Sequence, residues 1–177
     1  MAIQRLRQGL RALFAFSRPV DLALAEKFLT PEQLALFRRM RRGEQLHSLN
    51  VLRTVVAQSS EVSVTTPPEL ATAALLHDVG KSRYPLRLWQ KTIAVLVRAF
   101  APATFKRLSK GDPRRMIQRP FVVYVRHPVW SAELLAECNA SPAAIWLVAH
   151  HANDADKLPV SDLIPLLKRL QHADDAN

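Results

Sequence analysis

The chain has 177 residues, a length that fits one domain with a substantial hydrophobic core. Apolar residues make up 49% of it, which excludes an intrinsically disordered chain. The single cysteine, Cys138, excludes an internal disulfide framework and fits a reducing compartment. The formal net charge of +10 fits an ordinary basic surface, and it also suits phosphorylated substrates, anionic lipid or nucleic acid.

The composition favours an all-α fold, because only four residues are glycine and long β-branched runs are few. No window reaches the roughly 20 apolar residues of a membrane-spanning helix, and the longest candidate, residues 93–105, contains Arg98 and Pro102. The first seven residues intersperse arginine among apolar positions and show no cleavable apolar region. We therefore expect a cytoplasmic protein, at most peripheral at the inner membrane face.

The first 29 residues predict a helical extension, and residues 30–177 predict the main domain. Residues 3–15 place apolar side chains at helical spacing among arginines. We expect this helix to pack on its own domain, and a helix lying on a membrane surface is the alternative. Thr30 and Pro31 predict the start of a helix, with Gln33 able to close a capping box. That helix should end in a cluster of arginines: Arg38, Arg39, Arg41 and Arg42.

Gly43 is expected to separate this helix from the next one, which covers residues 45–58 and carries His47 on or beside its apolar face. Thr66 predicts the cap of a buried helix that ends at His77 and Asp78. Residues 86–108 predict a long apolar helix with basic ends, bent or split at Pro102, and this helix is also suited to a homodimer.

Residues 110–119 are basic and contain Gly111 and Pro113, so we expect a loop there. Residues 121–126 have the β-branched content of a strand, but we predict helix because they lead into His127, where the next helix should open. Residues 139–142 should close that helix and cap another over residues 143–151. A last helix is expected from about Ser161.

The central stretch of the chain is residues 75–81, Leu-Leu-His-Asp-Val-Gly-Lys. The apolar run before it predicts a buried helix that ends in the ionisable pair His77-Asp78. Burying such a pair is costly unless something compensates the charge, and a divalent cation bound by one imidazole nitrogen and one carboxylate oxygen would do so. For this dipeptide alone, a solvated helix end followed by a capping glycine explains the pattern better.

The histidines strengthen the metal interpretation when they are taken together. Five of the six lie in or at the end of predicted apolar helices: His47, His77, His127, His150 and His151. Solvent-facing histidines would not gather at helix ends in this way, so the set predicts a convergent metal site. The sixth, His172, is assigned to the surface.

In order and setting, these residues resemble the HD-domain superfamily of metal-dependent phosphohydrolases. The resemblance covers about residues 30–177 and rests on one ordered set: His47, His77-Asp78 with Gly80-Lys81, His127, His150-His151 and Asp174. The additional His127 and the His150-His151 pair are most similar to the HD-GYP-related branch. The resemblance implies a helical bundle with a metal site at its centre.

Carried over by position, the resemblance implies two groups of ligands. The first metal would be bound by His47, His77, Asp78 and Asp174, and the second by His127, His150 and His151 with Asp78 bridging. Asp175 remains an alternative to Asp174. Asp78 and Lys81 match the catalytic positions, and Lys81 matches the lysine that contacts phosphate.

Two departures from the HD-GYP pattern concern the substrate. Ala152 stands where that pattern has glutamate, and residues 153–159 lack the Gly-Tyr-Pro element that helps to recognise cyclic diguanylate. The expected substrate is therefore left as a nucleotide, cyclic dinucleotide or other phosphorylated small molecule. Arg83 and Arg126 are expected near the substrate because they lie close in sequence to the motif residues.

The mixture of imidazole and carboxylate ligands implies one or two divalent transition metals, with Mn or Fe favoured and Ni, Co, Zn or Mg as alternatives. The expected activity is hydrolysis of a phosphomonoester or phosphodiester. The competing interpretation is a non-catalytic signalling or binding module of the same fold. An anionic membrane surface is a further expected partner, whereas no nucleic-acid-binding motif is present.

Overall fold

The computed structural model describes residues 19–61 and 65–177, and the helix expected over residues 3–15 lies outside them. Within the described residues the fold is all-α, as predicted, with two short 3-10 helices and no strand. In chain order the helices are α2 (Leu22–Glu26), α3 (Pro31–Arg39), α4 (Arg42–Glu61), α5 (Pro68–Leu76), η2 (Val79–Arg83), α6 (Leu88–Phe100), α7 (Pro102–Leu108), α8 (Arg119–Glu137), α9 (Pro142–His150), η3 (Ala155–Lys157) and α10 (Ile164–Asp175).

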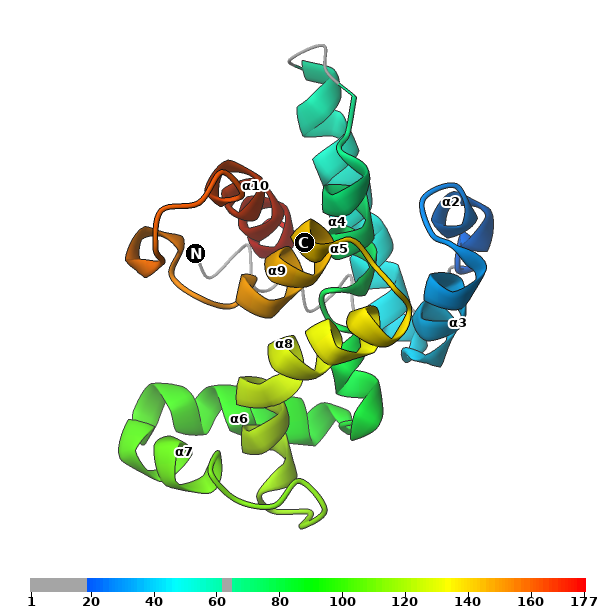
Figure 1. The fold of residues 1–177 in the computed structure, drawn as a ribbon. Helices are drawn as coiled ribbons and strands as arrows, with labels where there is room; N and C mark the ends of the chain where they lie inside the picture. Colours follow the sequence, from blue (N-terminus) through cyan, green and yellow to red (C-terminus); the bar gives the residue numbers. More distant parts are fainter. Residues whose placement is uncertain (1–18, 62–64) are drawn as a thin grey trace.

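Helix α5 occupies the middle of the bundle, and its neighbours are α3, α4, α9 and α10 (Figure 1). Every residue from Leu70 to Leu76 is buried, because α5 is apolar around its whole circumference. A helix of that kind can only be stable when other helices cover all of its faces. The end of α5 is therefore held deep inside the molecule, which fixes the position of the residues that follow it.

The predicted capping box at α3 is confirmed: Thr30 Oγ1 accepts from the Gln33 backbone N–H, and the Gln33 side chain accepts from Thr30 N–H. Ser141 likewise caps α9, as expected for the segment 139–142. The prediction for Thr66 was wrong, because α5 begins after Pro67 with no side-chain cap. The prediction that Gly43 separates two helices was also wrong. Gly43 lies in the first turn of α4, because glycine can adopt helical backbone angles.

Helix α8 differs from the expected pattern in one respect. Residues 121–126 are helical as predicted, but His127 and Pro128 do not open a new helix, because both lie inside α8. An internal proline removes one backbone N–H and usually breaks a helix. Here the carbonyl of Tyr124, which lacks that partner, has the His127 ring nitrogen Nδ1 at 3.0 Å instead. The helix continues because a side chain takes the place of the missing backbone donor.

Helices α6 and α7 form a hairpin that packs on the first half of α8 and lies at the edge of the bundle (Figure 1). The expected break at Pro102 is confirmed, since α6 ends at Phe100 and α7 begins at Pro102. Phe105 of α7 makes edge-to-face contacts with the rings of Phe121 and Tyr124. The hairpin is thus firmly attached to α8, while much of its surface remains outside the core. Among the described residues, no helix combines the length and apolarity needed to cross a membrane.

Candidate metal centre

The end of α5 carries the two residues around which the site is built. His77 is the C-cap of α5, and Asp78 precedes the 3-10 helix η2. Their exposed fractions are 1% and 5%, so both are taken almost completely out of water. Two ionisable side chains at this depth need compensating partners. Those partners come from helices far apart in the sequence.

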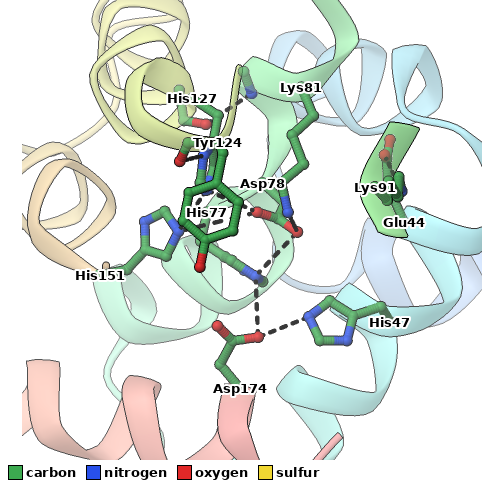
Figure 2. Close-up of polar contacts among 12 residues, drawn as sticks. Glu44, His47, His77, Asp78, Lys81, Lys91, Tyr124, His127, His151 and Asp174 are labelled. Carbon is green, nitrogen blue, oxygen red and sulfur yellow. Dashed lines mark hydrogen bonds and ion pairs between the residues drawn. The ribbon is translucent and has the colours of Figure 1, made fainter. Parts of the chain in front are cut away.

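Two groups of potential ligands share Asp78. One consists of His47, His77 and Asp78, and the other of Asp78, His127 and His151; within each group the ligand atoms lie within 4.8 Å of one another. Asp174 on α10 joins the first group, because its Oδ1 lies 2.7 Å from His47 Nε2 and 3.6 Å from His77 Nε2 (Figure 2). The aspartate that contacts these two histidines is Asp174, the residue that the sequence favoured over Asp175.

Three of the site histidines are oriented by backbone carbonyl groups. Nδ1 lies 3.1 Å from the Ala74 oxygen in His77, 3.0 Å from the Val123 and Tyr124 oxygens in His127, and 2.7 Å from the Val148 oxygen in His151. A carbonyl oxygen can only accept, so each Nδ1 carries the hydrogen and donates it. Whenever the ring is neutral, the opposite nitrogen, Nε2, therefore presents a lone pair toward the carboxylates of the site.

The convergence of these lone pairs fits a bound cation. His127 Nε2 lies 3.2 Å from His151 Nε2 and 3.3 Å from Asp78 Oδ1, while the buried Nε2 of His77 has no hydrogen-bond partner. Two acceptor nitrogens that face each other repel unless a proton or a metal ion lies between them. Metal–imidazole bonds of about 2.0–2.1 Å place neighbouring ligand atoms about 3.0–3.4 Å apart, which matches the spacing observed here.

Lys81 extends from η2 and lies beside the shared carboxylate, with Nζ 2.6 Å from Asp78 Oδ2. Burial acts to raise the pKa of Asp78, but the positive charges of Lys81 and His77 outweigh it and hold that pKa well below its usual range. Burial acts to lower the pKa of Lys81, and Asp78 outweighs it, so the ammonium pKa is raised. Asp78 is therefore a carboxylate and Lys81 a cation at neutral pH.

The other site residues respond to the same balance. Burial, reinforced by His77 and His127, lowers the pKa of His151 to about 3, so this ring is neutral and able to act as a ligand. Burial also disfavours charge on His77, but the carboxylates of Asp78 and Asp174 prevail and raise its pKa. Burial acts to raise the pKa of Asp174, but the hydrogen bond from His47 and the nearby His77 imidazole outweigh it and lower that pKa. The site thus combines ionised carboxylates with at least one neutral imidazole.

Gly80 allows η2 to lie directly against α8. Its backbone N–H donates to Ser131 Oγ at 2.7 Å. A Cβ atom at this position would lie 2.3 Å from the His127 carbonyl oxygen and 2.7 Å from the Ser131 nitrogen, distances that no methyl group tolerates. Glycine at this position is needed for the close approach that brings Asp78 and His127 together.

A cavity of about 970 Å³ opens over the ligands, lined by Asp78, Lys81, His127, His151 and Asp174 among others. Sequence reasoning missed four of its polar residues: Arg98, Tyr124, Lys168 and Gln171. Arg98 donates to the Tyr124 hydroxyl, and its guanidinium lies 4.9 Å from the centre of that ring. Tyr124 precedes His127 by three residues on α8, a spacing that could have indicated it; nothing in the sequence around Arg98, Lys168 or Gln171 does so.

Three predicted site residues lie away from this cluster. His150 belongs to neither ligand group; its ring stacks on Trp146 at 4.4 Å, and its Nδ1 lies 2.8 Å from the Trp146 carbonyl oxygen. Arg83 instead pairs with Glu133 at 2.5 Å and Glu137 at 3.7 Å on α8. Arg126 lies over the Trp130 ring at 5.3 Å. None of the three lines the cavity.

Comparison with known proteins gives one match. The model of the HD domain family matches residues 46–176, which include every member of both ligand groups. No curated protein and no solved structure matches the chain.

Proposed function

Since this chain belongs to the HD domain family, we propose that it is a metal-dependent phosphohydrolase that cleaves a phosphomonoester or phosphodiester bond. The substrate class is a nucleotide, a cyclic dinucleotide or another phosphorylated small molecule. The observation that carries the proposal is the pair of imidazoles, His127 and His151, whose Nε2 atoms face each other and Asp78 at the base of an open cavity. The group they form with Asp78 supports the HD-GYP-related branch of the family.

The residues that would hold metal are His47, His77, Asp78 and Asp174 for one ion and Asp78, His127 and His151 for another. Mixed nitrogen and oxygen donors suit Mn, Fe, Co, Ni or Zn better than Mg, which prefers oxygen alone. Divalent ions at such a site lower the pKa of bound water and neutralise charge on phosphoryl oxygens. His150 is left out of the proposed ligands, because its ring is occupied with Trp146.

The protein's own side chains would bind and orient the phosphate. Lys81 keeps its proton because Asp78 raises its pKa, so it supplies a fixed positive charge at the base of the cavity. Arg98 donates to the Tyr124 oxygen, which leaves the phenolic hydrogen free to donate to a substrate oxygen. Lys168 is partly occupied by Asp156 at 2.7 Å, so it is the weaker of the basic groups at the rim.

The test is hydrolysis of p-nitrophenyl phosphate and bis-p-nitrophenyl phosphate in the presence of Mn²⁺, by wild type and Asp78→Asn. Loss of the shared carboxylate should lower the rate by at least about 1000-fold, because both ligand groups depend on it. Asp162→Asn is the matched control, since Asp162 is exposed and lies outside the cavity. Metal binding without hydrolysis of either ester would instead favour the non-catalytic module.

A further inference from the structure

The outer surface of helix α6 carries a row of exposed apolar side chains. Trp89, Ile93, Leu96 and Phe100 recur at the spacing of one helical face and are exposed by 49%, 41%, 49% and 83%. We call these four residues the apolar stripe. The buried residues of the same helix, Gln90 and Ala94, lie on its other side, toward the bundle. A single exposed leucine needs no explanation, but four large side chains in one row indicate a contact surface.

The stripe belongs to the most basic part of the chain. Residues 87–119, which we call the basic hairpin, comprise α6, α7, the turn before α8 and the first residue of α8. They contain nine lysines and arginines and one carboxylate, that of Asp112. Within the described residues, Lys91 is the one hairpin cation that pairs with a carboxylate, Glu44. Lys106, Arg107, Lys110, Arg114 and Arg115 are all exposed.

The hairpin is held in place by hydrogen bonds and by aromatic contacts with α8. Gln90 of α6 donates to the Met116 carbonyl oxygen at 3.2 Å, and Arg119 donates to the Pro113 carbonyl oxygen at 2.9 Å. Phe105 anchors α7 against α8 through the rings of Phe121 and Tyr124. Figure 1 shows the hairpin at the edge of the molecule, on the far side of α8 from α10. A rigid edge element with an apolar row can dock on a partner without further folding.

We propose that the basic hairpin docks on an anionic lipid surface, with the apolar stripe inserted at the boundary between headgroups and acyl chains. Charge selects this partner. A second copy of the chain would bring nine like charges against nine, whereas anionic headgroups complement them. A nucleic acid would complement the charge but would leave the stripe in water. An amphipathic basic helix whose apolar face includes tryptophan is typical of interfacial binding.

The docking proposal is independent of the hydrolase chemistry. It is tested by sedimentation of the full chain with vesicles of phosphatidylcholine containing about one third phosphatidylserine, and with pure phosphatidylcholine. We expect binding to the anionic vesicles only, and loss of binding at high salt, because exposed charge pairs are screened. The fluorescence of Trp89 should shift to shorter wavelength on binding, and the shift should be absent in Trp89→Phe.

Two pairs of variants test whether the basic hairpin is the surface that binds the vesicles. Phe100→Ser should weaken vesicle binding by tenfold or more, because it removes the most exposed member of the stripe. Val160→Ser, which changes an even more exposed residue outside the hairpin, should leave binding unchanged. Lys110→Glu should weaken binding by about tenfold, while Lys27→Glu on the exposed end of α2 should have a smaller effect.

Failure of the full chain to bind anionic vesicles would overturn the proposal, as would binding that survives Phe100→Ser unchanged. A stripe that instead holds two copies together would appear as a dimer in sedimentation equilibrium that Phe100→Ser converts to monomer without vesicles. Binding to a 30-nucleotide single strand in preference to vesicles would likewise overturn it in favour of nucleic acid.

Discussion

His127 Nδ1 and the Tyr124 carbonyl oxygen lie 3.0 Å apart, and Pro128 has no backbone N–H that could occupy that oxygen. In a regular helix the N–H of residue 128 would bond to that oxygen. The proline leaves the oxygen available, and the histidine one position earlier uses it. The result fixes Nδ1 as the donor of His127 and turns its Nε2 toward Asp78 and His151.

Pro128→Ala should therefore weaken metal binding at the group formed by Asp78, His127 and His151. The new backbone N–H would compete with the imidazole for the Tyr124 oxygen, and loss of such an orienting bond costs about tenfold in metal affinity. Calorimetric titration with Mn²⁺ measures it. Val129→Ala, an exposed neighbour on α8, should leave affinity unchanged. Equal affinities for Pro128→Ala and wild type would show that the carbonyl does not orient the ring.

Alanine substitutions of Gly80 and Gly43 should have opposite effects on stability. Gly80→Ala should lower the free energy of unfolding by about 3 kcal/mol, because its Cβ would collide with the His127 carbonyl and Ser131. Gly43→Ala should raise it by about 0.5–1 kcal/mol, since no atom lies within 4 Å and alanine favours helix α4. Urea denaturation of the chelated proteins measures both. A neutral Gly80→Ala would mean that η2 can move away from α8.

Substitutions of the adjacent residues His150 and His151 should differ in the number of metal ions that the protein retains. His151→Gln should remove the second ion, since its Nε2 faces His127 at 3.2 Å, whereas His150→Gln should retain both ions because that ring stacks on Trp146. Mn²⁺ stoichiometry by titration distinguishes the two variants. Loss of an ion in His150→Gln would return that residue to the ligand set implied by the family resemblance.

The metal-free protein should lose stability on acidification through His151. Burial lowers its pKa from 6.5 to about 3, so between these values the unfolded chain binds a proton that the folded protein does not. The stabilisation is present above pH 6.5 and is lost as the pH falls. Between pH 7 and pH 5 the loss should be about 2 kcal/mol.

His77 acts in the opposite direction, because its folded pKa is raised: its stabilisation is complete below pH 6.5 and is lost as the pH rises through the folded value. The difference between wild type and His151→Gln therefore isolates the His151 contribution. Urea unfolding in the presence of chelator at pH 7 and pH 5 should show a shallower pH dependence in the variant. Parallel curves for the two proteins would contradict the buried neutral imidazole.

Helix ends and motif spacing in the sequence predicted His77-Asp78 after an apolar run and Asp174 near the end of the last helix, and the structure brings these side chains together. The sequence also grouped His150 with His151, but neighbouring helical residues point about 100° apart, and the His150 ring stacks on Trp146 outside both ligand groups. Arg83, which was expected near the substrate, pairs with Glu133 and Glu137 of α8 instead. Arg98 lies on a hairpin far away in sequence, so only the tertiary packing brings it to the cavity.

The most direct test of the central claim is elemental analysis of metal bound per chain, in wild type and Asp78→Asn, purified without chelator and then reconstituted with Mn²⁺. Two ions per wild-type chain, and none retained by Asp78→Asn, is the predicted result, because that carboxylate belongs to both ligand groups. Wild-type protein that binds no metal after reconstitution, or Asp78→Asn that binds as much as wild type, would contradict the account.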